Sequence, residues 1–81
     1  MLMHYLNAAM EKAHYEMIED EEPFYGEIPG LEGLWATGST LEGCRRSLMD
    51  ALEDWVFFSI SRGEPLPPIG EAVLELPRKL A

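Results

Sequence analysis

The sequence has 81 residues, of which 15 are acidic and 6 basic, so the net charge is −9 at pH 7. A chain of this length buries only about 60–65% of its unfolded surface, which limits it to one core and favours self-association as a dimer or tetramer. The negative charge repels a phosphate backbone, so we expect no autonomous binding of nucleic acid.

A short amphipathic helix is predicted for residues 2–12, because apolar residues recur there at three- and four-residue spacing. Two segments rich in aromatic and β-branched residues follow at 15–19 and 24–28. Three acidic residues and a proline separate them, which indicates a β-hairpin with an acidic tip. Glycines and a proline then supply a turn, and residues 34–37 are predicted to form a short third strand.

A long helix is predicted from Ser39 to Arg62. Ser39 and Glu42 have the spacing of a capping box, in which the Ser39 hydroxyl accepts a hydrogen bond from the first turn. Gly63 and the prolines after it end the helix. Its apolar stripe has the 3.6-residue period of a face packed on a sheet. The stripe consists of Leu41, Cys44, Leu48, Leu52, Trp55 and Ser59, widened by Ala51, Val56 and Phe58.

Residues 72–76 are expected to form a short C-terminal strand, paired either with the domain's own sheet or with another copy of the chain. The predicted order is therefore α-β-β-β-α, followed by this strand. That order is an α+β fold, with a three-stranded antiparallel sheet covered by the long helix. We assign residues 1–68 to one domain and residues 69–81 to a C-terminal tail.

Several function classes are disfavoured by the sequence. The longest apolar stretch is far too short to span a bilayer and no signal-peptide pattern opens the chain, so we expect a cytoplasmic protein without membrane contact. The spacings of His4, His14 and Cys44 match no zinc site. Cys44 lies on the helix stripe, where it packs as a small hydrophobe, and Ser39 is a helix cap rather than a nucleophile. We therefore expect no enzyme activity, cofactor or metal.

The acidic run of the hairpin is the least ordinary feature of the sequence. It consists of Glu19, Asp20, Glu21 and Glu22, and no Lys or Arg occurs from Ala13 to Cys44. Two interpretations remain open. The run is either a solvated hairpin tip that keeps the protein soluble, or part of a face that meets a basic partner.

Two aromatic residues, Tyr25 and Trp35, lie on adjacent predicted strands. Because side chains alternate across a strand, these residues face away from the core as exposed anchors, or the N-terminal helix covers them, or the opposite face of the sheet is the outer one. We take Tyr25 and Trp35, together with the four residues of the acidic run, as the candidate partner-binding residues.

Three segments carry a family resemblance. They are residues 15–20 (YEMIED), 25–31 (YGEIPGL) and 36–44 (ATGSTLEGC), and they resemble the HicB-type antitoxin module of the UPF0150 family. The resemblance continues through the long helix and the prolines that follow it, and covers roughly residues 15–68. The resemblance implies a partly degraded RNase H-like α+β module without a catalytic carboxylate set. It also implies a partner, a small basic RNA-cleaving toxin of the HicA type, which the module binds and neutralises.

The chain departs from the family pattern after Pro68. Family antitoxins commonly carry a C-terminal DNA-binding segment, and the residues that follow Pro68 are too few for a helix-turn-helix. An RNase H-like origin also raises a hydrolase hypothesis, but strand alternation and the helix cap assign Glu16, Glu27 and Glu42 to separate places. The alternative function is an orphaned HicB-like fold that self-associates or binds a small ligand.

Overall fold

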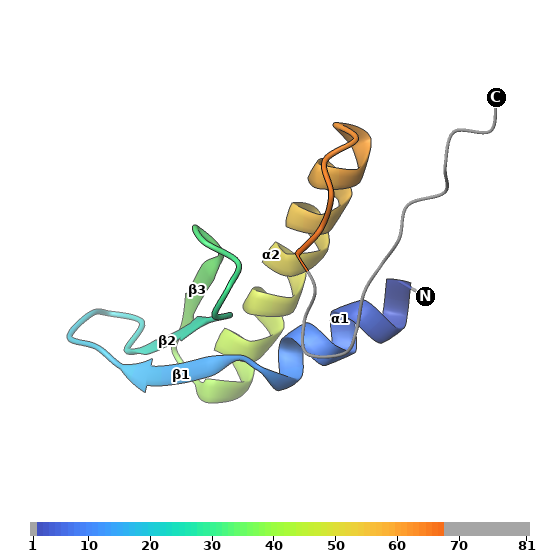
Figure 1. The fold of residues 1–81 in the computed structure, drawn as a ribbon. Helices are drawn as coiled ribbons and strands as arrows, with labels where there is room; N and C mark the ends of the chain where they lie inside the picture. The colour runs from blue at the N-terminus through green and yellow to red at the C-terminus, as the bar shows by residue number, and fades with distance from the viewer. Residues whose placement is uncertain (1, 68–81) are drawn as a thin grey trace, which may run out of the picture.

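The computed structural model describes residues 2–67 and has the predicted α+β order (Figure 1). Its elements are α1 (Leu2–Glu11), β1 (His14–Met17), β2 (Phe24–Glu27), β3 (Trp35–Gly38) and α2 (Leu41–Ser61). The strand predicted at 72–76 lies outside the described residues, as does the rest of the tail. Neither helix of the described part is long and apolar enough to cross a membrane.

The three strands form one antiparallel sheet in the order β1-β2-β3. Its register aligns Tyr15, Gly26 and Ala36 across the sheet. These three residues face α2, since a Cβ on Gly26 would lie 3.3 Å from the Cys44 sulfur. Helix α2 packs on β3 and β2, and α1 packs on α2 rather than on a strand (Figure 1). The other face of the sheet carries no helix of the described chain.

The core lies between α1, α2 and the inner face of the sheet. Its largest fully buried side chains include Tyr5, Ile28, Leu48, Leu52 and Val56. Past the end of α2 the chain returns to this core, where Leu66 is buried and the Tyr5 hydroxyl donates a hydrogen bond to the Pro67 carbonyl. This return closes the end of the core that the sheet does not reach.

Gly38 allows β3 and α2 to approach each other closely. A Cβ at this position would lie 2.5 Å from the Cys44 backbone nitrogen and 2.8 Å from its Cα. Atoms at such separations overlap, so only glycine fits unless the backbone moves. The last residue of β3 therefore seats the first turn of α2 against the sheet.

The predicted helix cap is wrong by one residue. Thr40, not Ser39, is the N-cap, and its hydroxyl accepts a hydrogen bond from the Gly43 nitrogen at 2.9 Å. Both residue types cap helices well. Because β3 extends to Gly38, the chain turns at Ser39. Thr40 is then the residue beside the first backbone N–H groups of α2, which have no partner within the helix.

The buried stripe of α2 is narrower than predicted. It consists of Cys44, Leu48, Leu52, Val56 and Ser59. Leu41 is 49% exposed because it lies one turn before the point where α2 meets β3. Phe58 is 61% exposed, since the C-terminal half of α2 extends beyond the short sheet (Figure 1).

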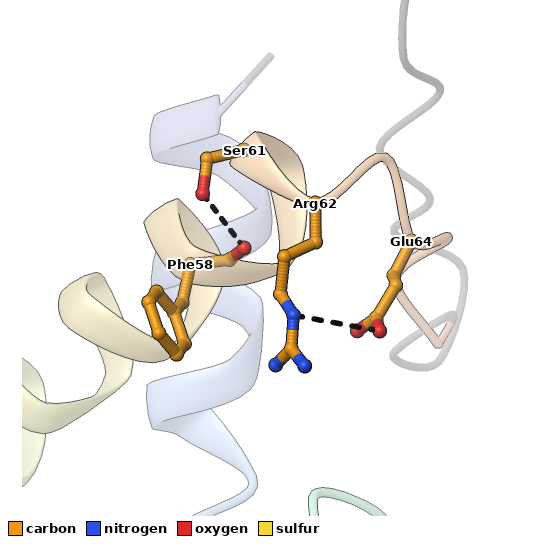
Figure 2. Close-up of polar contacts among 4 residues, drawn as sticks. All are labelled: Phe58, Ser61, Arg62 and Glu64. Atoms are coloured by element: carbon orange, nitrogen blue, oxygen red, sulfur yellow. Dashed lines mark hydrogen bonds and ion pairs between the residues drawn. The ribbon is translucent and has the colours of Figure 1, made fainter.

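The C-terminal end of α2 follows the prediction. Arg62 is the C-cap and Gly63 has a φ of 71°, a left-handed conformation that glycine adopts without strain. Figure 2 shows the Arg62 side chain between Glu64 and the Phe58 ring. Its Nε lies 3.8 Å from a Glu64 carboxylate oxygen and its guanidinium carbon lies 5.3 Å from the ring centroid.

Candidate functional site

The outer face of the sheet, opposite α2, is the candidate site. Strand alternation turns the neighbours of Tyr15, Gly26 and Ala36 to this face. The register brings them together in two cross-strand rows, His14-Glu27-Trp35 and Glu16-Tyr25-Thr37. We call these six residues the outer sheet face.

Two aromatic rings form the centre of the outer sheet face. Tyr25 and Trp35 stack with ring centroids 6.1 Å apart and an interplanar angle of 23°. Trp35 is 56% exposed and Tyr25 is partly exposed, and α1 packs on α2 and not over these rings. Of the alternatives left open by the sequence, the structure therefore has both residues on the outer face, with Trp35 the more exposed.

The Tyr25 hydroxyl is tied to an acidic neighbour. It donates a hydrogen bond to Glu27 Oε1 at 3.0 Å. Desolvation, this hydrogen bond and the negative charges of Glu27 and Glu16 raise the pKa of the Tyr25 hydroxyl above 10.0. The ring is held in place and stays protonated at neutral pH. Its surroundings are negative, which favours an approaching cation.

The acidic run joins the same region of the molecule. The Ile18 nitrogen donates to the Pro23 carbonyl at 2.7 Å, which closes the turn. Glu22 then accepts a hydrogen bond from the Thr37 hydroxyl at 2.7 Å, and its own backbone nitrogen donates to Asp20 Oδ2 at 3.3 Å. All four carboxylates of the run are exposed. Glu22 is thus fixed beside the outer sheet face, whereas the other three carboxylates belong to the turn itself.

Sequence reasoning missed two acidic members of this face. Glu16 and Glu27 were considered only as catalytic carboxylates, but both lie beside Tyr25. The spacing of two residues between Tyr25 and Glu27 could have found one of them, because such residues share a face of a strand. Glu16 depends on the pairing of β1 with β2, which the sequence does not fix.

The hollows beside this face are small for a typical ligand. One is bordered by His14, Tyr15, Glu16, Tyr25 and Glu27 and has a volume of about 130 Å³. Another lies between Tyr25, Glu27, Trp35 and residues 28–34 and has a volume of about 270 Å³. Pockets for drug-sized molecules usually measure about 300–1,000 Å³. A face of this shape suits one side chain of a protein partner better than a whole small molecule.

The candidate catalytic and metal-binding residues do not come together. Among residues 2–67, no three His, Cys, Asp or Glu side chains are grouped so as to hold a metal ion. His4 and His14 are exposed, one on α1 and one on β1. Cys44 is buried and its thiol points to the Ala36 carbonyl at 3.6 Å. Burial and the negative charge of Glu22 raise the pKa of this thiol, which disfavours the nucleophilic thiolate.

Comparisons with known proteins give a family and a similar solved structure. No curated protein matches the chain significantly. The crystal structure of TTHA0281 from Thermus thermophilus is similar, with 57% sequence identity, a TM-score of 0.93 and alignment over 95% of each chain. The sequence model of the UPF0150-like family matches residues 4–67. The chain belongs to the UPF0150-like family.

Proposed function

We propose that this chain is a non-enzymatic protein-binding module of the HicB antitoxin type. Its partner is a small basic RNA-cleaving toxin of the HicA type, which it neutralises by covering the toxin's surface. The observation that carries the proposal is the Tyr25-Trp35 stack, exposed at Trp35, with carboxylates around it. The six residues proposed to contact the partner are Glu19, Asp20, Glu21, Glu22, Tyr25 and Trp35.

The chemistry of the outer sheet face supports a cationic side chain as the bound group. An Arg guanidinium stacks on aromatic rings and forms paired hydrogen bonds with a carboxylate. Tyr25 and Trp35 provide the rings, and Glu16 and Glu27 provide the acceptors beside them. The exposed acidic turn extends the same negative potential outward, which accelerates encounter with a basic protein.

The proposal of a non-enzymatic role also has physical support. Hydrolysis by an RNase H-like site requires several carboxylates that converge on divalent metal ions. Glu16 and Glu27 lie on the sheet, whereas Glu42 lies in the first turn of α2 on the opposite side. Glu27 is further engaged by the Tyr25 hydroxyl.

Co-expression tests the proposal directly. The chain is co-expressed with the product of any small basic open reading frame that adjoins its gene, and the proteins are separated by size exclusion at low and moderate salt. We expect a stable complex, and we expect the chain to relieve the growth arrest that the basic protein causes alone. Recovery of two separate proteins at low salt, with growth arrest unrelieved, refutes the proposal.

A charge-matched pair of variants then locates the contact. Replacing the four carboxylates of the acidic run with amides should weaken the complex about 30-fold at low salt, if each exposed pair contributes roughly 0.5 kcal/mol. The control makes the same charge change at four exposed carboxylates on the helices, Glu11, Glu42, Asp50 and Glu53. An equal loss in both variants would mean that only net charge matters and that the acidic turn is no contact surface.

A Tyr25→Ala variant tests the aromatic part of the site. Tyr25 is the better choice because Trp35 also borders a second surface, described below. We expect at least tenfold weaker binding at all salt concentrations, since stacking is less sensitive to salt than exposed ion pairs. Unchanged binding of the toxin by this variant would remove the outer sheet face from the interface.

A further inference from the structure

A second surface lies at the free edge of the sheet. It is a groove between the start of β3 and the C-terminal half of α2, with a volume of about 540 Å³. Its lining includes Leu34, Trp35, Trp55, Phe57 and Phe58, and the one charged residue among the described lining is Asp54. Phe57 is 71% exposed and Phe58 61% exposed. This apolar groove is distinct from the acidic turn and from β1.

The groove runs beside an edge strand. In the order β1-β2-β3, one side of β3 has no strand partner among residues 2–67. Its residues Trp35, Ala36, Thr37 and Gly38 carry no charge, whereas β1 contains Glu16 and adjoins the acidic turn. An uncharged edge strand with unpaired backbone groups is a template for pairing with another strand. The β3 edge lacks the charges that usually prevent such pairing.

We propose that this groove and the β3 edge form the surface through which two copies of the chain associate. The strands β3 of the two copies pair antiparallel about a two-fold axis and make a continuous six-stranded sheet. The C-terminal halves of both α2 helices then cover each other's exposed aromatic rings. A two-fold interface brings the same patch of both copies together, so it must be compatible with itself. An uncharged apolar patch meets that condition, whereas the acidic surface of a chain with net charge −9 does not.

The exposed area fits a dimer of ordinary size. Trp35 is 56% exposed, and aromatic side chains bury roughly 150–250 Å² each. Together, Trp35, Phe57 and Phe58 therefore expose roughly 400 Å² of side-chain surface on each copy, within the roughly 300–600 Å² of the largest patch on a typical monomer, which is often functional. A stable interface covers about 800 Å² per partner, so these rings supply about half, with the β3 edge and the flanks of α2 as the remainder.

The groove shares Trp35 with the outer sheet face, but the acidic turn and Tyr25 lie outside it. Variants of Phe57 and Phe58 therefore test self-association, and variants of Tyr25 and the acidic run test binding of a basic partner. In the antiparallel arrangement the two acidic turns lie toward opposite ends of the joined sheet. A dimer would therefore present two separate outer sheet faces. Binding of a basic partner and self-association can fail or succeed separately.

Sedimentation equilibrium over a range of protein concentrations tests the proposal with the full chain. The monomer mass is 9.2 kDa, and we expect twice this mass for the wild type. Phe57→Glu and Phe58→Glu should each raise the dimer dissociation constant about a hundredfold or more, since each variant alters both copies. Both side chains are exposed in the single copy, so the fold should be retained, as far-UV circular dichroism will show.

A matched control separates the two sheet edges. Met17 is 69% exposed and lies on β1, the opposite edge. We expect Met17→Glu to leave the dimer unchanged. A dimer that Met17→Glu dissociates and both phenylalanine variants preserve would place the interface at β1 and overturn the proposal. A wild type that stays monomeric at millimolar concentration overturns it as well.

Hydrogen exchange identifies what covers the groove. We expect those amides of β3 that point away from β2 to become protected as protein concentration rises in the wild type and to stay unprotected in Phe57→Glu. Protection of the same amides in a monomer at every concentration would show that a segment of the same chain occupies the edge. That result also overturns the proposal.

Discussion

Replacing Gly38 by alanine tests how α2 is held on the sheet. The added Cβ would lie 2.5 Å from the Cys44 backbone nitrogen, whereas ordinary contacts are 3.4–4 Å. The first turn of α2 and the end of β3 must therefore separate by about 1 Å, and no side chain can rotate to relieve the contact. Overpacking of this kind costs about 1–3 kcal/mol, and we expect the upper end because the contact involves backbone atoms on both sides.

The predicted loss is large for so small a domain. An 81-residue chain has a free energy of unfolding of roughly 4–12 kcal/mol. A loss of about 3 kcal/mol lowers the melting temperature by roughly 12–24 °C. Urea unfolding followed by far-UV circular dichroism measures the change in free energy, and an unchanged m-value will confirm that the same surface is exposed.

Gly26→Ala is the comparison variant, for which a smaller destabilisation than that of Gly38→Ala is expected. Its Cβ would lie 2.8 Å from Tyr15 Cε1, a side-chain atom that can move, so we expect a smaller loss of about 1–2 kcal/mol. The reasoning is refuted if Gly38→Ala lies within about 0.5 kcal/mol of the wild type. It is also refuted if Gly26→Ala proves the more destabilising of the two.

Three further predictions concern caps and tyrosines. Thr40→Ala should lower the free energy of unfolding by about 1 kcal/mol, whereas Ser39→Ala should change it by less than about 0.5 kcal/mol; equal effects would contradict the assigned cap. Tyr5→Phe should lower the free energy of unfolding by about 1 kcal/mol, because the Tyr5 hydroxyl donates a hydrogen bond to a backbone carbonyl. Tyr15→Phe should leave it unchanged or raise it, because the buried Tyr15 hydroxyl has no hydrogen-bond partner among the described residues. Urea unfolding measures both changes. Burial raises the pKa of Tyr5, Tyr15 and Tyr25 above 10.0. The stability that these hydroxyls contribute is therefore complete below pH 10 and is lost as the pH rises through their pKa values in the folded state. Ionisation followed at 295 nm should begin above pH 10, and a tyrosine that ionises earlier in the folded chain would contradict this.

Local patterns were enough to predict the elements of the fold. Helical spacing identified α1 and α2, and the position of Gly63 identified where α2 ends. The cap was misassigned because Ser39 and Thr40 are both good caps, and the choice depends on how far β3 extends. Phe58 was misassigned because helical period alone does not reveal that the sheet is shorter than the helix it supports.

The composition of the candidate site was harder to predict than the fold. The exposed positions of Tyr25 and Trp35 depend on which face of the sheet α2 covers, a tertiary property. Their stacking depends on the register between β2 and β3. The hydrogen bond between Thr37 and Glu22 joins the acidic turn to β3, and no local signal in the sequence indicates it.

Strand β1 is held less firmly than the rest of the sheet. None of its four residues is buried, its Met17 side chain is 69% exposed, and Tyr15 is its one side chain packed against the core of the described chain. Native proteins open locally where few buried contacts oppose the opening, at a free-energy cost below that of global unfolding. Amides of β1 should therefore exchange faster than the ladder amides between β2 and β3. The acidic turn begins at the end of this strand, so the turn can adapt to the shape of a partner while Gly38 keeps β3 and α2 rigid. Binding of the proposed partner should therefore slow amide exchange in β1 more than in any other strand.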